Sequence, residues 1–187
     1  MRKLPRSFYL RPTLQVAREL LGKFLVRRFN GELLIGKIVE VEAYLGERDP
    51  ASHAFRGMTK RNEVMFRRGG HLYVYFTYGM HHCCNVVTEV EGLGRAVLIR
   101  AVEPVCGIEM MKRNRYKNKV SRTGRVDAFS LTNGPAKLCQ ALCLSREQNG
   151  MDLMDDDLYL TEGETIQPRL ILRSRRIGIA SGIEKRW

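Results

Sequence analysis

The stretch KFLVRRFNGELLIGKIVEVEAYL, from Lys23 to Leu45, decides the fold of this chain. Apolar, β-favouring residues recur on both sides of Asn30-Gly31, a dipeptide that strongly favours a tight β-hairpin turn. We therefore expect two long antiparallel strands joined at Asn30-Gly31. The second strand carries two acids, Glu40 and Glu42, in an otherwise apolar run, and the role of these carboxylates is the main question that the sequence raises.

Further hairpins follow this one. HLYVYFTYGMHHCCNVVTEV (His71–Val90) predicts two strands around Tyr78-Gly79, and RAVLIRAVEP (Arg95–Pro104) predicts another strand after a turn at Glu91-Gly92. The other expected elements are helices at Thr13–Gly22, from Gly107 to about Lys117 and at Asn133–Leu144, a loop at Asn118–Ser130, and short strands at Asp157–Glu162 and Arg169–Ile179. The pattern predicts a single α+β domain over residues 1–187, with a curved, mostly antiparallel β-sheet, flanking helices and a protruding β-hairpin.

The chain is strongly basic. Its 187 residues include 32 lysines and arginines against 20 acids, which gives a net charge of +12, and the cations cluster at Thr59–Gly70 and Met111–Arg125. Such clusters favour a polyanionic partner, with nucleic acid ahead of an anionic membrane; solubility alone is the plain alternative. No run of about 18 apolar residues predicts a membrane helix, and the N-terminus lacks the apolar run of a secretory signal. We expect an intracellular protein.

The five cysteines are odd in number and do not have the spacing of a disulfide framework, so we expect free thiols in a reducing compartment. The run HHCCN (His81–Asn85) has the residue types of a metal site. Successive side chains of a strand point to opposite faces, however, so adjacent residues cannot converge on one ion. We expect no metal there, and a metal hydrolase that uses His81, His82 and Cys83 is the weakest of the functional alternatives.

Strand alternation divides the acid-bearing stretch into two faces: Ile38, Glu40, Glu42 and Tyr44 on one, and Val39, Val41 and Ala43 on the other, which we expect to face the core. The acidic face is either open to solvent or the floor of a pocket. The apolar flanks and the long following loop, which holds His53, favour a pocket. A partly buried carboxylate has a raised pKa and can act as a general base.

Aromatic residues and one arginine complete the candidate site. Tyr78 precedes a glycine at a predicted hairpin tip, where an exposed ring can wedge between bases. Tyr44, His53 and Tyr75 are candidates to sandwich a planar ligand. Arg100 lies in an apolar strand and needs a carboxylate partner, for which Glu42 is one candidate; a pair with Glu103 or Glu109, or a side chain that reaches the surface, is an equal alternative. An enzyme that extrudes a base from a duplex needs all these parts.

At these residues the chain resembles the alkyladenine (3-methyladenine) DNA glycosylases of the vertebrate type, which also occur in bacteria. The matching stretches run in order over nearly the whole chain: ARELLGKFLVRR, GKIVEVEAYLG, ASHAFRG, TKRNEVMF, GGHLYVYFTYGMHHCCNVV, AVLIRAVEP and TNGPAKLCQAL. The resemblance implies hydrolysis of the N-glycosidic bond of 3-methyladenine, 7-methylguanine and hypoxanthine in double-stranded DNA. It also implies a monomer that has no lyase step and needs no cofactor or metal.

The resemblance also assigns roles to residues. Glu42 matches the general base, and Arg100 the residue that helps it to hold water; Glu40 is not the catalyst. Tyr44, His53 and Tyr75 match residues that contact the flipped base, Asn85 matches one that screens purines, and Ala96 and Leu98 lie beside the pocket. Tyr78 matches the intercalating wedge. Arg61, Met80 and Lys137 are candidates for contact with the DNA backbone, although surface exposure alone explains them equally well.

Two function classes stay open at this point. The first is a DNA glycosylase, acting in the nucleoid of a bacterium or the nucleus of a eukaryote. The second is a catalytically silent nucleic-acid-binding module on the same fold, because a fold alone does not determine an activity.

Overall fold

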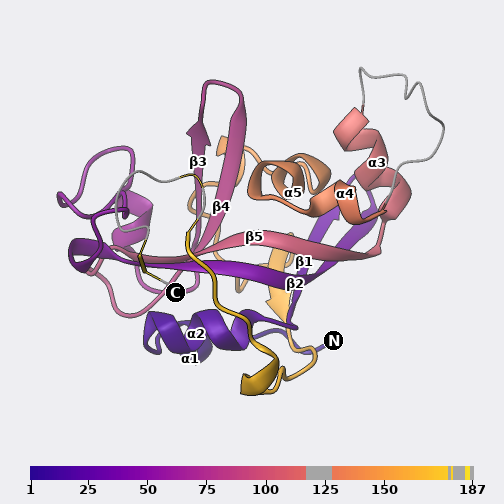
Figure 1. The fold of residues 1–187 in the computed structure, drawn as a ribbon. Coiled ribbons are helices and arrows are strands. Elements are labelled where there is room, and N and C mark those ends of the chain that lie inside the picture. The colour runs from indigo at the N-terminus through magenta and orange to yellow at the C-terminus, as the bar shows by residue number, and fades with distance from the viewer. Residues whose placement is uncertain (117–127, 177, 179–183, 186–187) are drawn as a thin grey trace.

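Six strands form one sheet in the order β3-β4-β5-β2-β1-β6, and every pair of neighbours is antiparallel. The computed structural model describes residues 1–116, 128–176, 178 and 184–185. The strands are β1 (Phe24–Phe29), β2 (Glu32–Leu45), β3 (Leu72–Thr77), β4 (His81–Val87), β5 (Arg95–Cys106) and β6 (Leu158–Thr161). The long strands β2 and β5 curve through the middle of the molecule (Figure 1). The predicted α+β fold with a curved antiparallel sheet is confirmed.

The first hairpin has the predicted turn. Phe29 pairs with Glu32, and the two residues between them, Asn30 and Gly31, have φ values of 49° and 79°. Positive φ at both positions matches the right-handed twist of the flanking strands, which is why Asn-Gly is favoured there.

The second hairpin, β3–β4, stands out from the sheet (Figure 1). Its turn is closed by the Met80 N–H, which donates to the Thr77 carbonyl at 3.3 Å. The two residues inside this turn, Tyr78 and Gly79, have φ values of 50° and 68°. The hairpin therefore carries a tyrosine in a backbone conformation that usually selects glycine or asparagine.

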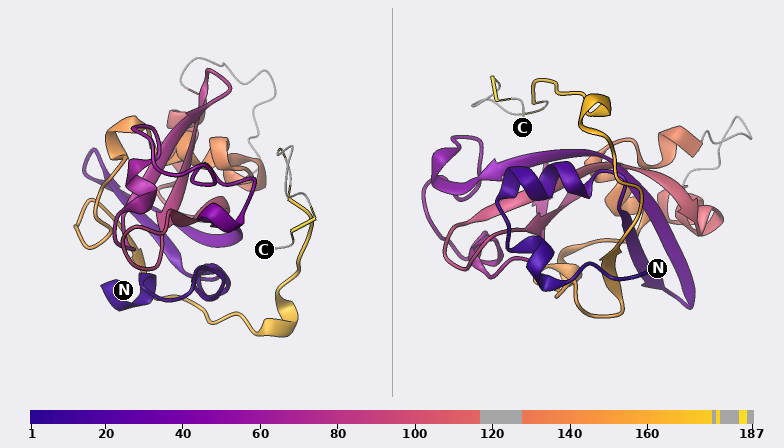
Figure 2. Two further views of the ribbon diagram at one scale, coloured as in Figure 1. Left: turned by 90° about the vertical axis from the view of Figure 1, so that its left-hand side faces the viewer. Right: turned by 90° about the horizontal axis from the view of Figure 1, so that it is seen from below.

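Helices cover both sides of the sheet. The short α1 (Arg6–Tyr9) and α2 (Thr13–Leu20) lie on one side, and α3 (Ile108–Tyr116), α4 (Ala128–Thr132) and α5 (Pro135–Ala141) lie on the other (Figures 1 and 2). Single 3₁₀ turns form at Gly46–Arg48, Glu63–Phe66, Arg146–Gln148 and Pro168–Leu170. The helices predicted from Thr13, Gly107 and Asn133 are present. The prediction of a loop at Asn118–Ser130 is wrong for residues 128–130, which begin α4. Residues 118–127 lie outside the described part of the chain.

The buried face of α2 shows why this segment is helical. Val16, Ala17 and Leu20 follow helical spacing and all belong to the main hydrophobic core. The helix stops before Gly22, which has a φ of 83°; a Cβ there would lie 2.5 Å from the Glu164 carbonyl oxygen. Glycine is therefore required on two grounds at the point where the chain turns into β1.

The predicted core face of β2 needs one correction. Ala43 is buried and Val41 packs against the core, but Val39 is 50% exposed. The pairing of β2 with β5 is irregular at this point, with register shifts on both sides of Glu40. This irregularity interrupts the regular ladder and leaves the Val39 side chain facing solvent.

The last predicted strand, Arg169–Ile179, is wrong over its described residues. Residues 168–170 form a 3₁₀ turn, and residues 171–176 have no regular structure. This segment, which we call the C-terminal arm (residues 171–176), crosses the sheet in front of β2 (Figure 1). Over its described residues it pairs with no strand of the sheet, and its apolar Leu172 is 93% exposed. Residues 177 and 179 lie outside the described part of the chain.

Candidate active site

The register of three strands brings the central candidate residues together. Asn85 on β4 pairs with Leu98 on β5, and Leu98 pairs with Glu42 on β2. Two residues along, Ala96 pairs with Tyr44. Because cross-strand partners lie on the same face of a sheet, these five side chains share one face. Asn85, Leu98, Ala96 and Glu42 are all buried.

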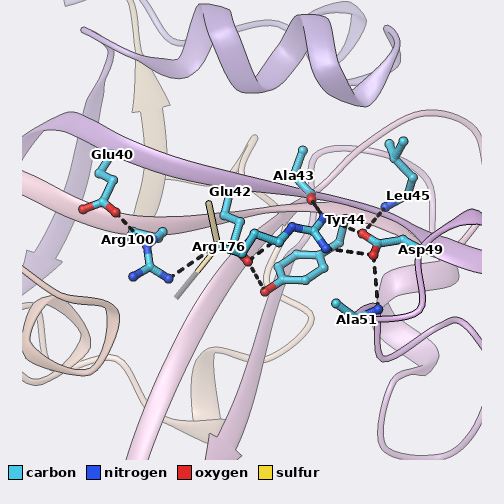
Figure 3. A network of polar contacts seen from close by, with 9 residues as sticks. All are labelled: Glu40, Glu42, Ala43, Tyr44, Leu45, Asp49, Ala51, Arg100 and Arg176. Carbon is cyan, nitrogen blue, oxygen red and sulfur yellow. Dashed lines mark hydrogen bonds and ion pairs between the residues drawn. The ribbon is translucent and has the colours of Figure 1, made fainter. Parts of the chain in front are cut away.

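Glu42 is the centre of a polar network (Figure 3). Its side chain is 5% exposed, yet it meets three partners. The Tyr44 hydroxyl donates to Glu42 Oε1 at 2.5 Å, Arg100 Nη1 donates to Oε2 at 3.1 Å, and Arg176 Nε lies 3.7 Å from Oε1. A carboxylate in such a site is held in one orientation by groups from three separate parts of the chain.

Arg100 contacts both acids of β2. Besides the Glu42 bond, its Nε donates to Glu40 Oε1 at 2.8 Å (Figure 3). The alternative partners are engaged elsewhere, Glu103 with Lys37 at 2.7 Å and Glu109 with Lys112 at 2.7 Å. The two acids of the strand therefore differ: Glu40, half exposed, anchors the outer edge of Arg100, and Glu42 lies buried behind it.

Burial and the neighbouring polar groups have opposite effects on the pKa of the Glu42 carboxyl. Loss of solvent raises the pKa of its carboxyl, and the Tyr44 hydrogen bond and the Arg100 and Arg176 guanidiniums lower it, with a net rise above the ordinary value. A carboxyl of this kind is a better proton acceptor than an ordinary surface glutamate. Burial and the neighbouring Glu42 carboxylate also raise the pKa of the Tyr44 phenol, so Tyr44 acts as a hydrogen-bond donor.

An aromatic cluster forms a second wall of the site. The His53 and Tyr75 rings meet edge to face with centroids 4.4 Å apart, and Tyr75 stacks on Tyr73 at 5.5 Å. His53 Nδ1 lies 3.0 Å from the Tyr73 hydroxyl, and burial, followed by the charge of Arg61, lowers the pKa of the imidazole. Both effects favour the neutral form of the imidazole over the imidazolium. The sandwich of a planar ligand between Tyr44, His53 and Tyr75 stays a prediction.

Hydrogen bonds of the buried Asn62 side chain fix the loop that carries His53. Asn62 is buried, and its amide group donates to the carbonyls of His53 at 2.7 Å and Gly57 at 3.0 Å. Its oxygen accepts from the Thr59 N–H at 2.6 Å. Asn85, the residue expected to screen purines, donates to the Tyr73 carbonyl at 3.2 Å. Both amides orient backbone next to the aromatic cluster.

The predicted DNA-contacting residues lie on several elements. Tyr78 and Met80 are exposed at the tip of β3–β4, by 78% and 68%. Arg61, exposed, donates to the Phe76 carbonyl on the same hairpin at 3.4 Å, and Lys137 in the first turn of α5 donates to Asn133 at 2.7 Å. A cavity of about 200 Å³ opens beside the hairpin and is lined by Lys60, Arg61, Val74, Tyr75, Phe76, Arg146 and Asn149. Three of these residues are cations, and none is an acid.

Two residues of the network were not anticipated from the sequence. Asp49 lies in the loop after β2 and Arg176 in the C-terminal arm, and their side chains form a fully buried ion pair. Arg176 belongs to a basic run, RSRR, that gives no indication which arginine turns inward. Asp49 lies in Asp-Pro, a dipeptide typical of turns. Neither pattern carries a signal for a pair separated by 127 residues.

Within the described ranges, no group of three histidine, cysteine or acidic side chains is arranged to hold a metal ion. No helix in the same ranges combines the length and apolar character that crossing a bilayer requires.

Comparison with known proteins identifies the family of this chain. The family model of the methylpurine-DNA glycosylases (MPG) matches residues 7–187. A relative from Carboxydothermus hydrogenoformans, named "Putative 3-methyladenine DNA glycosylase", is 53% identical over 96% of this chain and 90% of its own length. A relative of the same name from Prosthecochloris aestuarii is 51% identical over 100% of this chain and 86% of its own length. The chain belongs to the methylpurine-DNA glycosylase family.

Proposed function

We propose that this protein is a monofunctional DNA glycosylase that flips alkylated or deaminated purines out of duplex DNA and hydrolyses their N-glycosidic bond. The substrate class is 3-methyladenine, 7-methylguanine and hypoxanthine, and the product is an abasic site. Membership of the family and the names of the two relatives support the glycosylase activity. The arrangement around Glu42 supports the mechanism.

The observation that carries the proposal is the buried Glu42 carboxylate between Arg100 and Tyr44. In the proposed reaction, Glu42 accepts a proton from a water molecule that Arg100 helps to hold. The water oxygen bonds to C1′ of the deoxyribose, and the base leaves with the electron pair of the N-glycosidic bond. The sugar becomes positively charged on the way, and a nearby carboxylate stabilises that charge.

An alkylated purine is a favourable substrate for such a site. Methylation at N3 or N7 gives the base a positive charge, so it departs as a neutral molecule and needs little help from an acid. Aromatic faces attract a cationic, electron-poor ring more than a neutral one. A neutral His53 fits this role better than an imidazolium, which would repel the cationic base.

The flipped base and the duplex would be held by different parts of the molecule. The exposed Tyr78 ring at the hairpin tip has the position of a wedge that fills the space left in the stack. The cations beside the hairpin, Lys60, Arg61 and Arg146, suit contacts with phosphates. We propose that the protein acts on DNA as a monomer and without a metal or cofactor.

The alternative is a nucleic-acid-binding module without activity. One feature of the site favours the enzyme: Glu42 is buried at the cost of its hydration and hydrogen bonded in one orientation, which duplex binding alone does not require. The two functions differ in one measurement, namely the release of free base.

The experiment is base release from a duplex that contains one hypoxanthine or 7-methylguanine. Wild-type protein should release the base and leave an abasic site, without strand cleavage before alkali is added. The Glu42→Gln variant should bind the duplex but release no base. The Glu40→Gln variant is the matched control, since it alters the exposed acid on the same arginine and should keep activity. Normal cleavage by Glu42→Gln with loss in Glu40→Gln would refute the assignment.

A further inference from the structure

Arg176 is an isolated buried residue in an exposed segment. Residues 172–175 of the C-terminal arm are all exposed, whereas the Arg176 side chain is 1% exposed. An arginine is almost never fully buried unless it is paired. Its burial in an arm without regular structure therefore marks a specific attachment point, and this point lies at the proposed catalytic base (Figure 3).

Asp49 supplies the counter-charge. Its side chain is fully buried, and its two oxygens accept from Arg176 Nη1 at 2.8 Å and Nη2 at 2.5 Å. Arg176 Nη2 also donates to the Ala43 carbonyl at 2.5 Å, between the two functional residues of β2. Asp49 itself accepts from the Ala51 and Leu45 N–H groups at 3.1 and 3.4 Å. The guanidinium is thus locked to the end of β2 and to the loop that leads to His53.

The locked guanidinium contacts both members of the Glu42–Tyr44 pair. Its carbon lies 4.7 Å from the centre of the Tyr44 ring, and its Nε lies 3.7 Å from Glu42 Oε1. Tyr44 reaches the same Oε1 atom with its hydroxyl. A pair with Asp49 alone would satisfy a purely structural arginine; these two further contacts connect it with the reacting carboxylate.

We propose that Arg176 is a positioning residue for Glu42: held by Asp49, it fixes the Tyr44 ring and stabilises the negative charge on the carboxylate. The proposal rests on the proposed role of Glu42 as the general base. The charged and titratable groups around Glu42 are Tyr44 on the same strand, Arg100 on β5, Asp49 in the following loop and Arg176 in the arm. Arg100 holds Oε2 and Arg176 approaches Oε1, so the two arginines act on opposite sides of the carboxylate.

The decisive measurement is the pKa of the Glu42 carboxyl in the free protein, followed by NMR of ¹³C-labelled glutamate and assigned with Glu42→Gln. Because Arg176 lowers this pKa, Arg176→Gln should raise it above the wild-type value. The control is Arg95→Gln, which breaks another largely buried ion pair, with Glu89 at 2.5 Å, at the start of β5. It should leave the Glu42 pKa unchanged, so a general loss of stability is distinguished from a local effect.

Two further variants keep the test open if Arg176→Gln does not fold. Arg176→Lys keeps the charge and should hold the Glu42 pKa close to that of the wild type. The double variant Asp49→Asn/Arg176→Gln removes both charges of the buried pair together. It should still raise the pKa, because Arg176, with its Nε 3.7 Å from Glu42 Oε1, is the member of the pair that approaches the carboxylate. A Glu42 pKa that is unchanged in Arg176→Gln or in the double variant would overturn the proposal.

Activity gives a second, separable readout. In single-turnover base release, Arg176→Gln should shift the acid limb of the pH profile upward, and a shift of one unit lowers the rate below that limb about tenfold. Affinity for the damaged duplex should be kept. If wild-type protein releases no base, the proposed function fails while the NMR comparison still tests Arg176. If wild-type protein is active and the acid limb of Arg176→Gln does not move, only the role of Arg176 is refuted.

Discussion

At the scale of single residues, the protonation of Glu42 controls the proposed reaction. A general base works only when ionised, and burial raises the pKa of this carboxyl. We therefore expect single-turnover base release to increase with pH through a pKa above the ordinary range of glutamate.

The Tyr44 hydrogen bond lowers the pKa of the Glu42 carboxyl, so Tyr44→Phe should move the acid limb of the pH profile to higher pH. Tyr159→Phe, on the distant strand β6, is the control and should leave the profile unchanged.

The same carboxyl affects stability. A group whose pKa is raised in the folded state favours folding below its unfolded pKa, and that contribution is lost as pH rises through the folded pKa. We expect Glu42→Gln to gain stability relative to wild type across this window, by about 1.4 kcal/mol for each unit of the shift. Urea unfolding at a series of pH values measures the difference. A difference that stays constant with pH would contradict the raised pKa.

At the scale of elements, the tip of the β3–β4 hairpin carries a strained residue whose ring is the proposed wedge. Tyr78 has a φ of 50°, and a non-glycine residue in this region costs roughly 1 kcal/mol. Tyr78→Gly should therefore keep or increase the free energy of unfolding, by up to about 1 kcal/mol, and should weaken duplex binding. Chemical unfolding and a DNA titration test the two effects separately. Tyr78→Phe keeps the ring and should keep the affinity, and an unaffected affinity in Tyr78→Gly would remove the case for a wedge.

At the scale of the whole molecule, one buried ion pair joins two distant parts of the chain. Asp49 and Arg176 are 127 positions apart, and both side chains are almost fully buried. Removing one partner of a buried pair leaves an uncompensated charge, which typically costs about 3–5 kcal/mol. Asp49→Asn should lower the free energy of unfolding by this amount in a urea titration. Glu103→Gln breaks the more exposed pair with Lys37 and should have little effect.

The net charge of +12 is also a property of the whole molecule. Duplex affinity should fall steeply with salt concentration, because phosphate contacts release bound counterions. Lys60 lines the cationic cavity beside the hairpin, and Lys60→Gln should reduce the slope of log affinity against log salt by about 0.9 if it meets one phosphate. Lys37→Gln is the control, since Lys37 is already paired with Glu103 at 2.7 Å. Equal slopes for wild type and Lys60→Gln would show that this lysine makes no such contact.

Local patterns were sufficient for most of the fold. The Asn30-Gly31 turn and the helical spacing of residues 13–20 depend on neighbours in the chain, and both appear as expected. Strand alternation depends on neighbours too, but in β2 it fails at Val39, where the pairing with β5 is irregular. The prediction of a strand failed at residues 169–176, where the apolar residues 170–172 indicated one. A strand forms only where the backbone runs alongside a sheet edge, and the path of the backbone is a property of the whole molecule.

The candidate site, like the fold, could be predicted from the sequence only in part. Sequence by itself determined that Glu42 and Tyr44 share a strand face, because side chains alternate with a period of two, and that Tyr78 lies at a hairpin tip. Only the tertiary structure decided that Glu40 is the exposed partner of Arg100, and that Arg176 returns from the C-terminal arm to Asp49 and Glu42. These contacts join distant parts of the chain, and a buried charge finds its partner through the path of the backbone in space, which no local pattern of residues encodes.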